Sequence, residues 1–198
     1  DYYDYKKDDS NNLRPINYHI IDTNDSEYLN QYHRFRDLIF LGKYLNISKD
    51  IDNNLVEFIK HSFSDWIDNN SDSSKVGWAP YNISERLVHW VWILQWLPKD
   101  VFKNDIKWSK SVLKSINHQS SYLYENFEYN LGHHNHVINN ARALLTVAIS
   151  FPEMLKSNLW KKYSINVFEN EWKYQIVSDG AHSEQSLSYH FLLTRTLW

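Results

Sequence analysis

The sequence has 198 residues, of which 42% are hydrophobic and 23% charged, a balance typical of a folded globular protein. Its formal net charge of −3 argues against the broad basic surface that sequence-independent nucleic-acid binding requires, so we expect no nucleic-acid partner. No apolar run reaches the roughly 18 residues of a membrane-spanning helix. The sequence contains no cysteine, which excludes disulfides and thiolate metal sites.

Aromatic residues make up 16% of the chain, with 9 Trp and 14 Tyr, whereas Gly and Pro number only 4 each. Few helix-breaking residues favour long helices. Trp and Tyr rings stack on the apolar faces of sugars, but they also fill the gaps between packed helices. A role in the core is the better interpretation for any single Trp.

Apolar residues recur at spacings of three and four along most of the chain, which predicts helices. We expect a tail and extended segment over 1–25 and one helical domain over 26–198, with Asp50 or Asp52 as the cap of its second helix. The seven expected helices are about 26–45, 52–68, 82–97, 104–126, 135–150, 153–177 and 183–198. Short connections favour antiparallel hairpins, in a bundle or in a closed ring. The last helix has no stop signal, so the chain looks cut.

The first candidate site lies at the start of the helix predicted over 135–150. Asn135, Asn139 and Arg142 share one face, where amides and a guanidinium can bind a sugar carboxylate, although such a face can equally meet only water. The opposite face carries an apolar stripe that we expect to be buried: Val137, Ala141, Leu144, Leu145 and Ala148.

Three histidines, His133, His134 and His136, precede or open the same helix and invite a metal interpretation. Two adjacent imidazoles do not converge easily on one ion, and no nearby carboxylate completes the set. We therefore expect no metal and no organic cofactor.

The second candidate site is the turn and helix over 179–190. Ser183 is a plausible helix cap, and the helix would then place Tyr189 and His190 on one side, as a possible acid and base pair. The alternative is that both are buried helix residues with satisfied hydrogen bonds. A third stretch, Trp78 to Trp90, holds Arg86, which can bind an anion or pair with a carboxylate on another helix.

Taken in order, these segments resemble the heparinase II/III-like polysaccharide lyases and the related alginate lyases with a helical toroid. The resemblance covers about 78–190. It depends on Trp78-x-Pro80-Tyr81 before Ser84-x-Arg86, on Asn135-His136-x-x-x-Asn140-x-x-Ala143-Leu144, on Phe151-Pro152-Glu153 with Trp160, and on Gln175-Ile176-x-x-Asp179-Gly180-x-x-x-Glu184-x-Ser186-x-x-Tyr189-His190.

The resemblance implies an incomplete α/α toroid followed, in the whole protein, by a β-sandwich. It implies β-elimination at a uronic acid of an acidic polysaccharide, in a bacterial protein that is periplasmic or secreted. Asn135 and His136 match the groups that stabilise charge on the uronate carboxyl group, and Tyr189 matches the acid and base. Substrate contacts are expected from Trp78, Tyr81, Arg86, Asn139, Glu184 and His190.

Two other functions stay open on the sequence. A glycoside hydrolase on an α/α toroid would use two carboxylates, such as Asp179 and Glu184, as acid and base. A non-catalytic protein for carbohydrate binding or polysaccharide assembly would keep the scaffold without the activity. Products separate the two enzymes, because only elimination leaves an unsaturated sugar.

Overall fold

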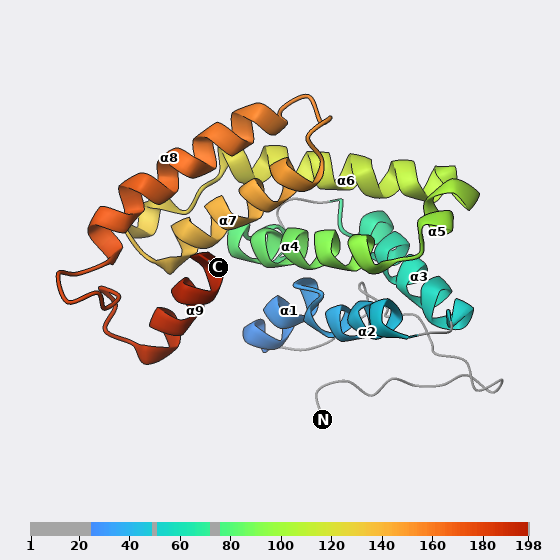
Figure 1. The fold of residues 1–198 in the computed structure, drawn as a ribbon, viewed down its shortest axis with the longest axis horizontal. Helices are drawn as coiled ribbons and strands as arrows, with labels where there is room; N and C mark the ends of the chain where they lie inside the picture. Colours follow the sequence, from blue (N-terminus) through green and yellow to red (C-terminus); the bar gives the residue numbers. More distant parts are fainter. Residues whose placement is uncertain (1–24, 49–50, 72–75, 198) are drawn as a thin grey trace. The chain divides into compact units, whose positions relative to one another are not determined.

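The computed structural model describes residues 25–48, 51–71 and 76–197, and these are helical, as the sequence predicts (Figure 1). The only pairing of strand type in these ranges is an isolated bridge between Ile176 and His182. The predicted tail over 1–25 lies, apart from Asp25, outside the described residues. The elements are α1 Ser26–His33, α2 Arg36–Ile47, α3 Asn53–Asn69, η1 Val76–Trp78, α4 Pro80–Trp96, α5 Lys99–Asn104, α6 Ile106–Glu125, η2 Tyr129–Leu131, α7 Asn135–Ser150, α8 Ser157–Gln175 and α9 Leu187–Leu197.

The helix expected over 26–45 is broken in two. Phe35 separates α1 from α2 and adopts a left-handed conformation, with φ of 59°. Its ring is 2% exposed and packs edge-on against Phe63 and Trp90, with ring centroids 5.5 and 5.4 Å away. Burial of a phenyl ring contributes roughly 2 kcal/mol, which offsets the cost of the unfavourable backbone conformation.

The start of α3 is capped by an aspartate, as the sequence predicts. Asp52 caps α3 by accepting hydrogen bonds from the backbone N–H groups of Asn54 and Leu55, at 3.0 and 3.2 Å, whereas Asp50 lies outside the described residues. Pro80 opens α4, two residues before the start at about 82 that the sequence predicts. A proline is tolerated there because the first helical N–H has no partner to lose.

The structure divides into two compact units. The first contains the chain up to Trp78 together with His89–Ile116, and the second contains Ala79–Val88 and Asn117–Trp198. Helices α4 and α6 each contribute residues to both units. Every side chain of the candidate site described below, from Tyr81 to His190, belongs to the second unit.

The core of the first unit is built from aromatic rings. Trp90 is fully buried and contacts Phe63 and Trp66, with ring centroids 4.5 and 5.5 Å away. The indole N–H of Trp66 donates to Nδ1 of His33 at 3.1 Å, so its polar atom is satisfied. Gly77 lies against the same imidazole, where a Cβ atom would come within 3.0 Å. These tryptophans are core residues, as the composition favoured.

The second unit is organised around α7, which packs antiparallel to α8. The predicted apolar stripe is confirmed, because Val137, Ala141, Leu144 and Ala148 are between 0% and 3% exposed, while Leu145 is half-buried. Val167 of α8 packs in the same cluster. The expectation of an open polar face is wrong for Asn139, which is only 2% exposed. Helix α7 is therefore covered on both sides.

Candidate functional site

Asn135, the first residue of α7, is tied to the segment that precedes α9. Its backbone N–H and its side-chain Nδ2 both donate to Oε1 of Glu184, at 2.9 and 2.8 Å. Asn135 is only 6% exposed. One carboxylate oxygen thus satisfies a backbone donor of the first helical turn and also orients the amide.

His136 is oriented by a second carboxylate, that of Glu128. Nδ1 of His136 lies 3.1 Å from Oε1 of Glu128, and the imidazole packs on Tyr81 with ring centroids 4.4 Å apart. A hydrogen bond at Nδ1 leaves Nε2 as the nitrogen that can exchange a proton or donate to a ligand. An imidazole held in this way by a carboxylate is a common arrangement in acid–base catalysis.

Glu128 is fixed from three directions. Asn140 donates from Nδ2 to Oε2 of Glu128 at 3.2 Å and accepts the backbone N–H of Glu128 at 3.1 Å. The carbonyl oxygen of Glu128 is 3.2 Å from Nε2 of His134, whose Nδ1 accepts the backbone N–H of His136 at 3.2 Å. His134 is therefore the cap of α7. We did not identify Glu128 from the sequence, because its partners lie across a loop.

His133 meets a buried acid. Its Nδ1 lies 3.0 and 3.1 Å from the two carboxylate oxygens of Glu171 on α8, and its ring stacks on Tyr174 at 3.9 Å. Glu171 is 2% exposed and also accepts a hydrogen bond from Gln175 at 2.8 Å. Glu171 lies 38 positions from His133, so no local pattern in the sequence pointed to it either.

The connection between α8 and α9 differs from its prediction. Helix α9 begins at Leu187, so Ser183 is not its cap. Ser183 and Glu184 form a turn, and Gln185 after it has a left-handed φ of 51°. His182 is 1% exposed and its Nε2 lies 3.0 Å from Oε1 of Gln175. Desolvation by burial lowers the pKa of His182; the Glu184 carboxylate opposes this shift and His190 adds to it.

Tyr189 lies on α9, which packs against α7, and it is 41% exposed. Its neighbour His190 is half-buried, with its backbone N–H bonded to the carbonyl oxygen of Ser186 at 2.9 Å. The two helices that carry Asn135 and Tyr189 are thus in contact. That a single uronate can touch both side chains stays a prediction.

Three residues expected to bind substrate are buried instead. Trp78 is 3% exposed, and its indole N–H donates to the carbonyl oxygen of Asn70 in the first unit at 2.6 Å. Arg86 is 0% exposed and donates from Nε to Oε1 of Gln119 on α6 at 2.8 Å, so this bond is to an amide and not to the carboxylate that the sequence offered as an alternative. Asn139, the third, is equally closed to solvent. As placed, none of the three presents a surface to a polysaccharide.

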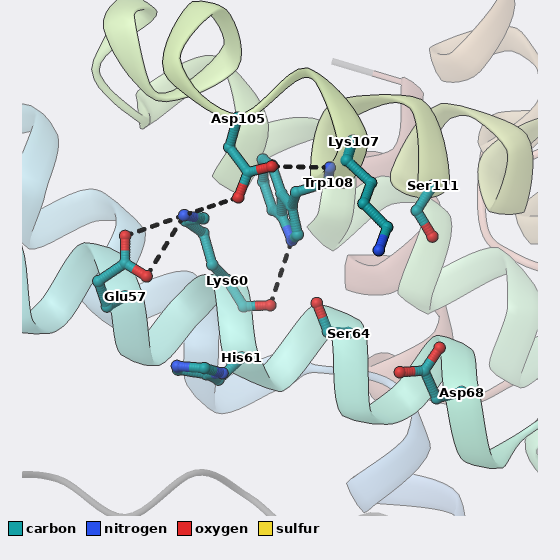
Figure 2. A pocket seen from close by; sticks show the side chains of 9 residues that line it. All are labelled: Glu57, Lys60, His61, Ser64, Asp68, Asp105, Lys107, Trp108 and Ser111. Atoms are coloured by element: carbon teal, nitrogen blue, oxygen red, sulfur yellow. Dashed lines mark hydrogen bonds and ion pairs between the residues drawn. The ribbon is translucent and has the colours of Figure 1, made fainter.

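The first unit has a surface groove lined mainly by charged and polar side chains (Figure 2). Lys60 lies in it, 2.9 Å from Glu57 and 3.1 Å from Asp105. Burial lowers the pKa of Lys60, but hydrogen bonds to these two carboxylates outweigh it and raise the pKa above the ordinary value. The charge of Lys60 is therefore paired within the protein.

Among the residues with described structure, no group of three or more His, Asp or Glu side chains is arranged to hold a metal ion. Within the same ranges, no helix combines the length and the apolar character needed to cross a bilayer.

Comparison with known proteins decides the family. The model of the heparinase II/III N-terminus matches residues 1–197. The chain belongs to this family. It is 28% identical to a heparin-sulfate lyase of Bacteroides thetaiotaomicron over 172 residues, and 28% identical to a heparin-sulfate lyase of Pedobacter heparinus over 200 residues. These alignments cover 83% and 96% of the chain.

Solved structures agree with this placement. A crystal structure of heparinase III matches 98% of the chain with a TM-score of 0.78 and 25% identity, and that of the heparan sulfate lyase of Pedobacter heparinus matches 98% with a TM-score of 0.74 and 24% identity. The chain spans 29% of each of these structures, and 23% and 28% of the two curated relatives. The all-helical fold expected from the resemblance is confirmed.

Proposed function

We propose that this chain is the helical part of a polysaccharide lyase that cleaves a uronic-acid-containing polysaccharide by β-elimination. The observation that carries the proposal is the start of α7, where an amide and an imidazole on consecutive residues are each oriented by a carboxylate. Membership of the heparinase II/III family supports it, as do the two heparin-sulfate lyases among its relatives. An acidic polysaccharide is the partner.

In elimination the proton on carbon 5 of the uronate leaves and the glycosidic oxygen departs from carbon 4. Negative charge grows on the carboxyl group as the proton leaves. Asn135 and His136 donate hydrogen bonds to that charge, and they are effective because the fold has oriented them beforehand. Tyr189 exchanges the proton through its hydroxyl group. His190 and Tyr81 contact the substrate beside these residues.

The residues of the hydrolase alternative have other partners in the fold. Oε1 of Glu184 is occupied by Asn135, and Oδ1 of Asp179 accepts the backbone N–H of Ala181 at 2.9 Å within its own turn. A hydrolytic acid needs a carboxyl group free to give its proton to the leaving oxygen. These contacts favour elimination over hydrolysis.

The test uses the full-length protein and a panel of polymers that includes heparan sulfate, alginate and unsulfated uronates. Heparan sulfate comes first because the matched relatives are heparin-sulfate lyases. Elimination is followed by the ultraviolet absorbance of the new carbon–carbon double bond, and hydrolysis by new reducing ends without that absorbance. Absence of the chromophore with every polymer would overturn the proposal, and reducing ends alone would establish the hydrolase.

A further inference from the structure

The bonds between Glu184 and Asn135 continue a longer chain of hydrogen bonds. This chain starts at Glu171 on α8 and passes through Gln175 and His182 before it reaches the backbone N–H of Glu184. Glu171, Gln175 and His182 are 2%, 0% and 1% exposed. Buried polar groups are costly unless each has a partner, so the direction of every bond in such a chain is constrained.

The hydrogen bonds of Gln175 decide which atom donates at each step of this chain. Its Nε2 donates to Glu171 at 2.8 Å and to the carbonyl oxygen of His134 at 2.9 Å, which uses both of its hydrogens. Oε1 of Gln175 is then the atom facing Nε2 of His182, so Nε2 must carry hydrogen. Nδ1 of His182 is left to accept the backbone N–H of Glu184 at 3.3 Å. Only neutral imidazole satisfies both neighbours.

The same logic fixes the amide of Asn135. Because Oε1 of Glu184 accepts from the backbone N–H of Asn135 as well, the group facing it must be the amide nitrogen and not the amide oxygen. The remaining N–H and Oδ1 of Asn135 are thereby held in one orientation. Without the carboxylate, the side chain would be free to flip or to change rotamer.

We infer that Glu184 is a positioning residue for Asn135, held in place by the buried relay of Glu171, Gln175 and His182, and that it does not bind the polysaccharide. The inference rests on the proposed function, in which Asn135 stabilises charge on the uronate. An ionised carboxylate would repel an acidic sugar chain. Its side chain is 26% exposed, and the two N–H groups that it accepts direct it to Asn135.

The test compares Glu184→Ala and Glu184→Gln, with Asn135→Ala, the double variant Asn135→Ala/Glu184→Ala, and the exposed Glu169→Ala on α8 as the matched control. Glu184→Ala should lower kcat by about tenfold to a hundredfold and leave KM within about twofold, because orientation matters most in the transition state. Glu184→Gln should recover most of the activity, since its amide oxygen can accept both hydrogen bonds. The double variant should resemble Asn135→Ala alone.

A rise in KM with unchanged kcat for Glu184→Ala would make Glu184 a substrate ligand and overturn the inference. Effects of the two alanine variants that multiply in the double variant would overturn it too, because positioning requires coupling. If wild type gives no unsaturated product, the proposed function fails separately. Crystal structures of wild type and Glu184→Ala then decide the positioning itself: an Asn135 side chain that has moved supports it, and one that is unchanged overturns it.

Discussion

Nδ1 of His136 lies 3.1 Å from a carboxylate oxygen of Glu128, while the other oxygen of that carboxylate accepts a hydrogen bond from Asn140. We therefore expect Glu128→Gln to lower kcat by roughly tenfold to a hundredfold, part of the 10² to 10⁴ that a positioned acid–base group contributes. The side-chain amide of the variant is uncharged and has only one acceptor oxygen, so it cannot accept from both His136 and Asn140 as the carboxylate does. The exposed Glu125→Ala is the control, and equal kcat values for the two variants would show that Glu128 only supports the fold.

Tyr189→Phe should leave folding intact and lower elimination by about two to four orders of magnitude. The ring is 41% exposed, so removal of its hydroxyl group costs little stability, whereas proton exchange with the sugar is lost. Ultraviolet absorbance measures the rate and the melting temperature reports folding. If the variant produces the chromophore as fast as wild type, Tyr189 is structural.

Asn135→Ala should lower kcat by roughly a hundredfold or more and change sugar binding less, because the amide acts on charge that develops in the transition state. It also deletes one of the two hydrogen bonds to Glu184, which should reduce the free energy of unfolding by about 1 kcal/mol. Kinetics and denaturant unfolding measure the two effects. A variant with normal kcat would refute the role of Asn135.

Because the pKa of His182 is lowered in the folded protein, we expect the free energy of unfolding to fall in acid. Burial lowers its pKa, the nearby Glu184 opposes this shift and His190 adds to it, while Glu171 is two hydrogen bonds away, through Gln175. Unfolded histidine binds a proton below about pH 6.5. As the pH falls through that value and towards the lower folded-state pKa, only the unfolded chain gains the proton, so the stability present at higher pH is lost.

The measurement is the melting temperature of wild type and His182→Gln between about pH 8 and pH 5, a range that brackets the ordinary histidine pKa. Wild type should lose more stability over this range than the variant, which has no imidazole at this position. Parallel curves for the two proteins would show that His182 does not couple folding to pH.

We expect Asp105 to contribute to the stability of the first unit. It caps α6 through the backbone N–H of Trp108 at 3.0 Å and also pairs with Lys60, and these two interactions lower its pKa, the cap contributing more. Asp105→Ala should lower the free energy of unfolding, because α6 loses its capping oxygen and Lys60 loses an ion-pair partner. Asp105→Asn keeps a capping oxygen and should lose less. Equal losses in denaturant unfolding would show that the ion pair matters more than the cap.

The local sequence pattern was enough to predict the all-helical fold, a helix cap at Asp50 or Asp52, of which Asp52 is the observed one, and the buried stripe of α7. These features depend on residues within one or two helical turns, where spacing alone decides which side chains share a face. The ordered motifs were likewise sufficient to indicate the family.

Tertiary structure alone decided which polar side chains meet. Glu184 bonds to Asn135 from 49 positions away, and Arg86 reaches Gln119 from 33 positions away. Phe35 breaks its helix because its ring is buried between two other aromatic rings. No local pattern encodes such contacts, because the partner of a buried side chain is set by which helices pack together. A buried polar group without a partner destabilises the fold.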